Sequence, residues 1–181
     1  MRTFSRSLAI VLIAVAAFII GCNKEQTASE ESTFAFVVYP GAKYYAQLTD
    51  LFKQAHKVIK PNEEPPPTAV YDTDAPLEDV ATYYAQQYGY GKVAADSTNN
   101  LSAARPAAYY RTGDLNADAK ATQEIMQKVN VKADTAKAVG AYKAAEIEAK
   151  PNRPHVTIER PYFDPTRNEV VNRTLILMFR Q

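Results

Sequence analysis

The sequence lacks several residue types on which enzyme and metal chemistry often depends. It contains no tryptophan, two histidines, six glycines and one cysteine, Cys22. A single cysteine cannot form an intrachain disulfide or a cysteine-rich metal site. Neither histidine has a second metal-binding residue at ligand spacing, and the glycines form no phosphate-binding loop. We therefore predict no metal and no cofactor.

An excess of charge of one sign is also absent. The chain carries 21 basic and 20 acidic side chains, which gives a formal net charge of +1. Domains that bind nucleic acids usually display a clustered basic surface, and so do domains attracted to anionic lipid. We therefore predict no nucleic-acid partner and no membrane attraction through a basic patch.

One long apolar run occurs, from Leu8 to Ile20. It is shorter than the ~20 residues of a membrane-spanning helix, and it follows Arg2 and Arg6 with no acidic residue between them. These features predict a secretion signal over residues 1–21. An uncleaved anchor is the alternative, and the shortness of the run argues against it. Cleavage by the ordinary signal peptidase is disfavoured by Ile19, which is too large for its position.

The apolar run ends in Ile19-Ile20-Gly21-Cys22, which resembles the lipobox of bacterial lipoproteins. The resemblance implies cleavage before Cys22, acylation of its thiol and attachment to a membrane. Two or three acyl chains form a stable anchor. Asn23 stands where Asp retains lipoproteins at the inner membrane of enteric-type bacteria. The resemblance therefore implies an envelope lipoprotein, on the periplasmic face of the outer membrane if the cell is Gram-negative.

The rest of the chain predicts a tether and one domain. Residues 22–33 comprise the lipidated Cys22 and a polar stretch, residues 23–33. This stretch has no apolar periodicity, which is typical of a flexible tether. Residues 34–181 are long enough to form one domain with its own core.

Apolar periodicity predicts helices and strands in this domain. Residues Leu48–Ile59 and Leu77–Tyr88 have helical spacing, and residues 115–149 are rich in Ala, Lys and Glu. We predict that the last helix is interrupted at Asn130–Asp134 or Gly140. Short β-prone runs predict strands at Phe34–Tyr39, Thr68–Tyr71 and Ala107–Tyr110.

The C-terminal segment has the strongest strand pattern. Val156 and Ile158 alternate with polar residues, Asp164–Asn168 supplies turn residues, and Val170–Phe179 includes a run that is apolar on both faces. Such a run is typical of a central, covered strand. These elements predict a single small α+β domain, in which helices cover an antiparallel sheet with a C-terminal hairpin.

Three short segments resemble uncharacterised bacterial envelope lipoproteins. They are Val38-Tyr39-Pro40-Gly41-Ala42, Val70-Tyr71-Asp72-Thr73 and Val80-Ala81-Thr82-Tyr83-Tyr84. Those proteins have a Tyr-Pro-Gly-Ala turn and then a strand–helix unit that ends in paired aromatics. The resemblance implies a small α+β domain and no established activity.

Two acidic motifs are candidate sites with simpler structural explanations. Asp114, Asn116 and Asp118 have the spacing of the first half of a calcium loop. The required glycine and the bidentate glutamate are missing, so we predict helix capping instead. Asp72 and Asp74 could form a carboxylate pair, but they precede a helix and are expected to favour its N-terminus. We therefore predict no catalytic residue. His56, flanked by lysines, is expected on a solvated helix face.

Tyrosine is the one residue in clear excess, with 12 in the chain. Tyrosine commonly lines the edge of a core, but it is also enriched in binding surfaces. The candidate ligand-binding residues are the three tyrosine pairs, Tyr44, Tyr45, Tyr83, Tyr84, Tyr109 and Tyr110.

Three functional hypotheses remain open. The leading hypothesis is a non-catalytic, membrane-anchored lipoprotein that binds an envelope protein or a small ligand, or supports an assembly. The second is a ligand-binding module with a tyrosine-lined cleft. The third is an enzyme whose carboxylates and tyrosines converge only in the fold.

Overall fold

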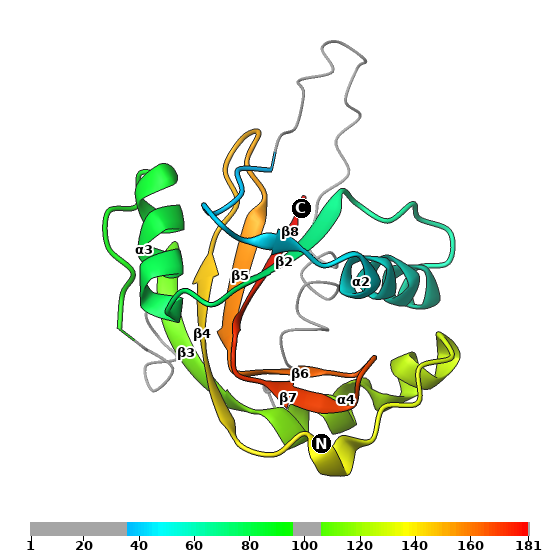
Figure 1. Ribbon diagram of the computed structural model, residues 1–181. Coiled ribbons are helices and arrows are strands. Elements are labelled where there is room, and N and C mark those ends of the chain that lie inside the picture. The colour runs from blue at the N-terminus through cyan, green and yellow to red at the C-terminus, as the bar shows by residue number, and fades with distance from the viewer. Residues whose placement is uncertain (1–35, 96–105, 181) are drawn as a thin grey trace, which may run out of the picture.

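A six-stranded antiparallel sheet forms the centre of the molecule (Figure 1). The computed structural model describes residues 36–95 and 106–180. The predicted signal, Cys22, the predicted tether and the first two residues of the predicted N-terminal strand lie outside these residues. The strand order is β1 (Lys43–Tyr44), β2 (Thr68–Thr73), β8 (Thr174–Phe179), β5 (His155–Arg160), β4 (Ala141–Ile147) and β3 (Ala108–Asp114).

The C-terminal part of the sheet agrees with the sequence pattern. Strand β8 lies between β2 and β5, and all six of its residues are buried. This confirms the predicted central strand, since both faces of β8 are covered. The predicted turn joins β6 (Tyr162–Asp164) and β7 (Glu169–Val171), which form a separate two-stranded hairpin. The α+β class with an antiparallel sheet is therefore confirmed.

Three helices cover the two faces of this sheet. Helix α3 (Leu77–Gln87) lies on one face, against β4 and β5. Helices α2 (Ala46–Ile59) and α4 (Leu115–Lys128) lie on the other face with the β6–β7 hairpin, as Figure 1 shows. A short 3-10 helix, η2 (Thr135–Lys137), follows α4. No helix in the described ranges is long and apolar enough to cross a membrane.

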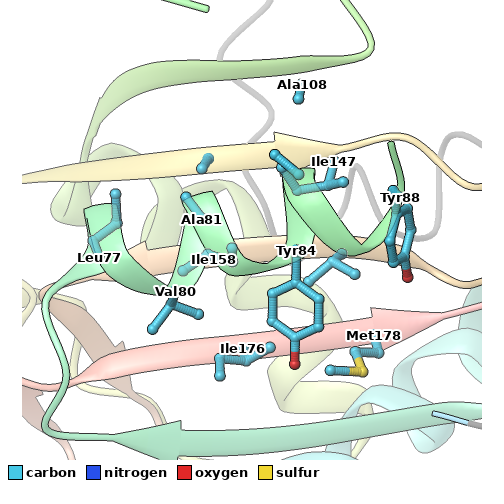
Figure 2. Close-up of a cluster of buried hydrophobic side chains, with 13 residues drawn as sticks. Leu77, Val80, Ala81, Tyr84, Tyr88, Ala108, Ile147, Ile158, Ile176 and Met178 are labelled. Carbon is cyan, nitrogen blue, oxygen red and sulfur yellow. The ribbon is translucent and has the colours of Figure 1, made fainter. Parts of the chain in front are cut away.

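The face under α3 forms an apolar core. Figure 2 shows Val80 and Tyr84 of α3, and Tyr88 directly after it, packed with Ile158 and Ile176 of the sheet. All five side chains are at most 3 % exposed. The helical face predicted from spacing is therefore confirmed. Full burial of such side chains contributes about 1.5–3 kcal/mol each, so this face is a major source of stability.

Two predicted elements are wrong. Residues 141–147, predicted as helix, form strand β4. Their helix propensity is overridden because Ala144 and Ala145 are fully buried on opposite faces of the sheet, and the small side chains let the covering elements pack closely. Residues 36–39, the described part of the predicted first strand, are not in a strand. Gly140, at a φ of 114°, lies directly before β4 and separates it from η2.

The environment of His56 also differs from the prediction. Its side chain lies on the inner face of α2 and is 3 % exposed. The flanking lysines suggested a solvated face, but His56 is one turn beyond Phe52 and shares its direction. Burial lowers the pKa of His56, and the positive charge of Lys60 lowers it further.

Candidate functional site

The sheet face under α2 and α4 carries a row of buried polar residues on β4 and β5. Adjacent residues of β5 point to opposite faces, so Val156 and Ile158 join the apolar core while Thr157 and Glu159 face the other helices. Register places Thr157 beside Glu146 of β4, and Glu159 beside Ala144. Polar groups from neighbouring strands are thereby aligned beneath α2 and α4.

Two adjoining cavities lie above this row. The first has a volume of about 50 Å³ and is lined by Leu48, Leu51, Phe52, Ala55, Met126, Thr157, Glu159, Tyr162, Phe163, Pro165, Leu175 and Leu177. The second also has a volume of about 50 Å³ and is lined by Leu115, Asp118, Ala119, Thr122, Met126, Ala133, Glu159, Phe163 and Pro165. One water molecule needs about 10–15 Å³ of such a cavity, so each cavity has room for a small organic group.

Glu159 lines both cavities. Its side chain is buried, with 8 % of the residue exposed. No described residue forms a hydrogen bond or an ion pair with its carboxyl group. Burial raises the pKa of Glu159 to about 8, and the nearby Asp118 and Glu146 raise it while Arg111 opposes them. Glu159 is therefore mostly protonated at neutral pH, and its carboxyl group faces an apolar space.

Glu146 has the opposite electrostatic environment. Its carboxylate accepts hydrogen bonds from Arg111 Nε at 2.9 Å, Thr157 Oγ1 at 2.8 Å and His155 Nε2 at 2.9 Å. Burial alone would raise the pKa of Glu146, but the bond from His155 and the charge of Arg111 lower it below its ordinary value. Glu146 thus remains ionised beside a neutral Glu159.

Arg111 extends the network to α4. Its Nη1 donates to the hydroxyl of Tyr142 at 2.9 Å, and that hydroxyl donates to Asp118. Burial raises the pKa of Asp118, although the bond from Tyr142 opposes this shift. Gly113 makes the arrangement possible because a Cβ there would lie 2.2 Å from Tyr142 Cζ. The ring of Tyr142 therefore crosses β3 only where a side chain is missing.

The β6–β7 hairpin closes one side of the cavities. Its residues Phe163 and Pro165 line both of them. The buried Asp164 fixes the hairpin to the rest of the domain by accepting hydrogen bonds from the Tyr45 hydroxyl and Thr166. Burial, together with the bond to Asp164, raises the pKa of Tyr45 to about 12. This arrangement holds the hairpin close to the start of α2.

The six predicted ligand-binding tyrosines do not converge on one cavity in the described structure. Tyr44 is 54 % exposed, whereas its neighbour Tyr45 packs against the α2 side. Tyr84 of α3 is fully buried in the apolar core between this helix and the sheet, and Tyr83 packs at the edge of that core. Tyr109 and Tyr110 are successive strand residues and so point to opposite faces; Tyr110 packs against the α3 core. This arrangement gives no support to a shared tyrosine cleft.

The acidic motifs mainly serve the fold. The Asp114 side chain accepts a hydrogen bond from Ala117 N, which confirms the predicted helix cap. Asp72 and Asp74 both form ion pairs with Arg173, each at 2.7 Å. Asp118 is the exception, because it lines the second cavity.

The sequence analysis missed Glu146 and Glu159, and it named Asp118 only for its spacing from Asp114 and Asn116, because the carboxylates of this site are widely separated along the chain. Asp118, Glu146 and Glu159 belong to α4, β4 and β5. One signal was present: β5 alternates polar and apolar residues next to β8, a strand apolar on both faces. A charged residue beside a strand covered on both faces must itself be covered.

Comparisons with protein-family models, with curated proteins and with solved structures each find no match to this chain. Within the described ranges, no group of three or more His, Cys, Asp or Glu residues is arranged to hold a metal ion. The chemistry offered by the described site is therefore that of an apolar cavity with carboxyl groups.

Proposed function

We propose that this protein is a membrane-anchored envelope lipoprotein whose domain binds a small apolar ligand with a polar head group. The ligand occupies the two cavities between α2, α4 and the sheet. The observation that carries this proposal is the carboxyl group of Glu159, which is buried, faces an apolar cavity and has no partner among the described residues. Burying a polar group without a partner costs about 1–3 kcal/mol, and a ligand that supplies the partner removes that cost.

The apolar lining supports binding rather than a purely structural role. Ligand sites combine mostly apolar walls with a few placed polar groups. Here α2 and β8 contribute leucines, the hairpin contributes aromatic residues, and Glu159 contributes the polar group. The lipidated Cys22, predicted from its lipobox, would keep this site at a membrane surface where apolar molecules concentrate.

Filling the cavity tests the binding proposal. We would measure the affinity of 1-butanol by ligand-detected NMR for the full chain in lipid nanodiscs, with empty nanodiscs as the reference for partitioning. Ala119 lines the second cavity, so Ala119→Leu should weaken binding about tenfold or more by occupying the space. Ala117 is exposed on the same helix, and Ala117→Leu is the matched control that should bind normally. No detectable binding to the unaltered protein, or equal binding by both variants, would overturn the proposal.

The anchor requires a separate test. Cys22→Ser, expressed in the native host, should abolish labelling by a radioactive fatty acid and release the protein from the membrane. Continued labelling of this variant would refute the lipobox interpretation.

A second candidate function is acid–base catalysis on the bound ligand. It is favoured by the divergent pKa shifts of Glu159 and Glu146, which keep one carboxyl protonated near another that is ionised. Such a pair resembles the acid and base assignments of many enzymes. A hydrolase screen would support this function if activity were lost in Glu159→Gln and retained in Glu124→Gln, which alters an exposed residue of α4.

A further inference from the structure

Two carboxyl groups share one cavity without a basic side chain beside them. Glu159 and Asp118 both line the second cavity, and among the described residues no basic side chain lines either cavity. Among the described residues, neither carboxyl group has a cationic partner within 4.0 Å. Asp118 receives only the hydroxyl hydrogen of Tyr142. Two carboxyl groups therefore face one small space without a counter-ion.

The nearest cation, Arg111, is engaged elsewhere through two of its three guanidinium nitrogens. Arg111 directs Nε to Glu146 and Nη1 to Tyr142. It can neutralise one carboxylate, and Glu146 holds it in that role with a 2.9 Å ion pair. His155 also bonds to Glu146. Neither basic side chain lines the cavity, so a bound cation would be the counter-ion of Asp118 and, once it ionises, of Glu159.

The walls argue for an organic cation rather than a metal ion. A divalent metal ion prefers several oxygen ligands and a hydrated shell, whereas the remaining walls here are apolar. Side chains of α2, including Leu48, Leu51 and Phe52, line the first cavity beyond Glu159. An alkyl chain can pack against these residues while a donor group contacts the carboxyls.

We infer that the ligand is a primary alkylammonium, with its charged head between Glu159 and Asp118 and its alkyl chain against α2. This inference rests on the proposed binding function and specifies the ligand class. The ammonium group supplies three donors and one positive charge, which matches two carboxyl groups that lack a cation. On binding, Glu159 loses its proton to the solvent and becomes the carboxylate partner of the ammonium group.

Matched four-carbon probes test the charge of the head group. We would measure the affinities of butylammonium, 1-butanol and butyrate for the full chain in lipid nanodiscs by ligand-detected NMR. Butylammonium should bind about tenfold more tightly than 1-butanol, and Glu159→Gln should remove that preference without weakening 1-butanol. Glu124→Gln, at an exposed position of α4, is the charge-matched control and should retain the preference. Thermal unfolding would verify that both variants are folded.

The pH dependence supplies a second readout. Because Glu159 has a pKa of about 8 and must ionise to pair with the cation, the affinity for butylammonium should rise roughly fivefold from pH 7 to pH 8. The affinity for 1-butanol should stay constant. The other titratable or charged described groups near Glu159 are Arg111 and Tyr142 through their network, Glu146 with His155, Asp118 from α4, and Tyr162 from β6. In Glu159→Gln the rise should disappear, which separates Glu159 from these neighbours.

The outcomes distinguish this inference from the proposed function. Equal binding of butylammonium and 1-butanol would overturn the ammonium inference and leave the apolar ligand site intact. Tightest binding of butyrate would also overturn it, because a protonated Glu159 would then serve as a donor to an anion. Binding of none of the three probes would overturn both proposals.

Discussion

The two faces of the six-stranded sheet differ in the residues that they bury. On the α3 face, Ile158, Ile176 and Tyr84 are fully buried in a continuous apolar cluster. On the opposite face, the same strands place Thr157 and Glu159 beneath two cavities. The period of two along a strand allows this separation. The α3 face can hold the fold together while the other face carries polar groups that weaken packing but can recognise a ligand.

The largest expected effect concerns the buried network of the cavity face. Glu146→Leu should destabilise the protein by about 4 kcal/mol, because it leaves the charge of Arg111 buried without its carboxylate. Urea unfolding measures this free energy. Glu148→Leu changes an exposed residue two positions along and should alter stability by no more than about 0.5 kcal/mol. Equal stability of the two variants would show that the network does not contribute to folding.

Adjacent residues of β8 compare the packing of the two faces directly. Ile176→Ala removes a side chain from the apolar core and should cost about 3 kcal/mol of unfolding free energy. Leu177 already borders a cavity and has fewer contacts to lose, so Leu177→Ala should cost about 2 kcal/mol. Both values come from urea unfolding. A greater loss for Leu177→Ala would mean that the cavity face is packed as tightly as the core.

The difference in pH-dependent stability between the wild type and Glu159→Gln isolates Glu159, because the lowered pKa of His56 adds the same opposing rise to both proteins. The pKa of the Glu159 carboxyl rises from 4.5 to about 8 on folding, so the folded state binds the proton more tightly than the unfolded state. The contribution of Glu159 to stability should therefore fall as pH rises between these values, by about 2.5 kcal/mol from pH 5.5 to pH 7.5. The pKa of Glu146 shifts downward, so its contribution is lost only in acid, below the ordinary value.

Unfolding in urea at a series of pH values measures this dependence. Glu159→Gln should remove the fall that Glu159 causes, since the glutamine does not titrate, and leave a curve that rises with pH through the effect of His56. The same pH dependence in the wild type and in Glu159→Gln would show that Glu159 is ionised and solvated in the folded protein.

The smallest effect concerns the two helix starts. Asp114 caps α4 through Ala117 N, whereas α3 begins after Pro76 with no side-chain cap. Asp114→Ala should lower the free energy of unfolding by about 1 kcal/mol, measured by thermal unfolding. Asp50→Ala, the control at an exposed position inside α2, should lower it less because alanine favours the helix interior. An unaffected melting temperature in Asp114→Ala would show that tertiary packing alone fixes the start of α4.

Sequence pattern predicted most of the fold but not the site. The apolar stripe of α3 and the fully apolar β8 were readable because each reflects its own local period. Strand β4 was misread because Ala144 and Ala145 favour helix when only neighbouring residues are considered, and their burial between covering elements reverses that preference. Predicting this required the pairing of β4 with β3 and β5, which depends on residues distant in sequence.

The site depended on such distant pairings to a greater degree. Glu146 and Glu159 approach each other through antiparallel register, and Asp118 joins them from α4 only through the Tyr142 hydroxyl. No local spacing encodes this arrangement. The tyrosine pairs had the opposite property: they are conspicuous in sequence, but the fold distributes them over different environments. Tyr109 and Tyr110 point to opposite faces of β3, whereas Tyr83 and Tyr84 pack against each other on α3.

The β6–β7 hairpin lines the cavities but is not part of the six-stranded sheet. It is inserted between β5 and β8, two strands that pair directly with each other. Changes in the length or composition of the hairpin therefore need not alter the register of the sheet. The same segment supplies Phe163 and Pro165 to the cavity walls. A change in the hairpin would therefore alter the cavity walls, and under the proposed function the ligand that fits them, while the folding core stays the same.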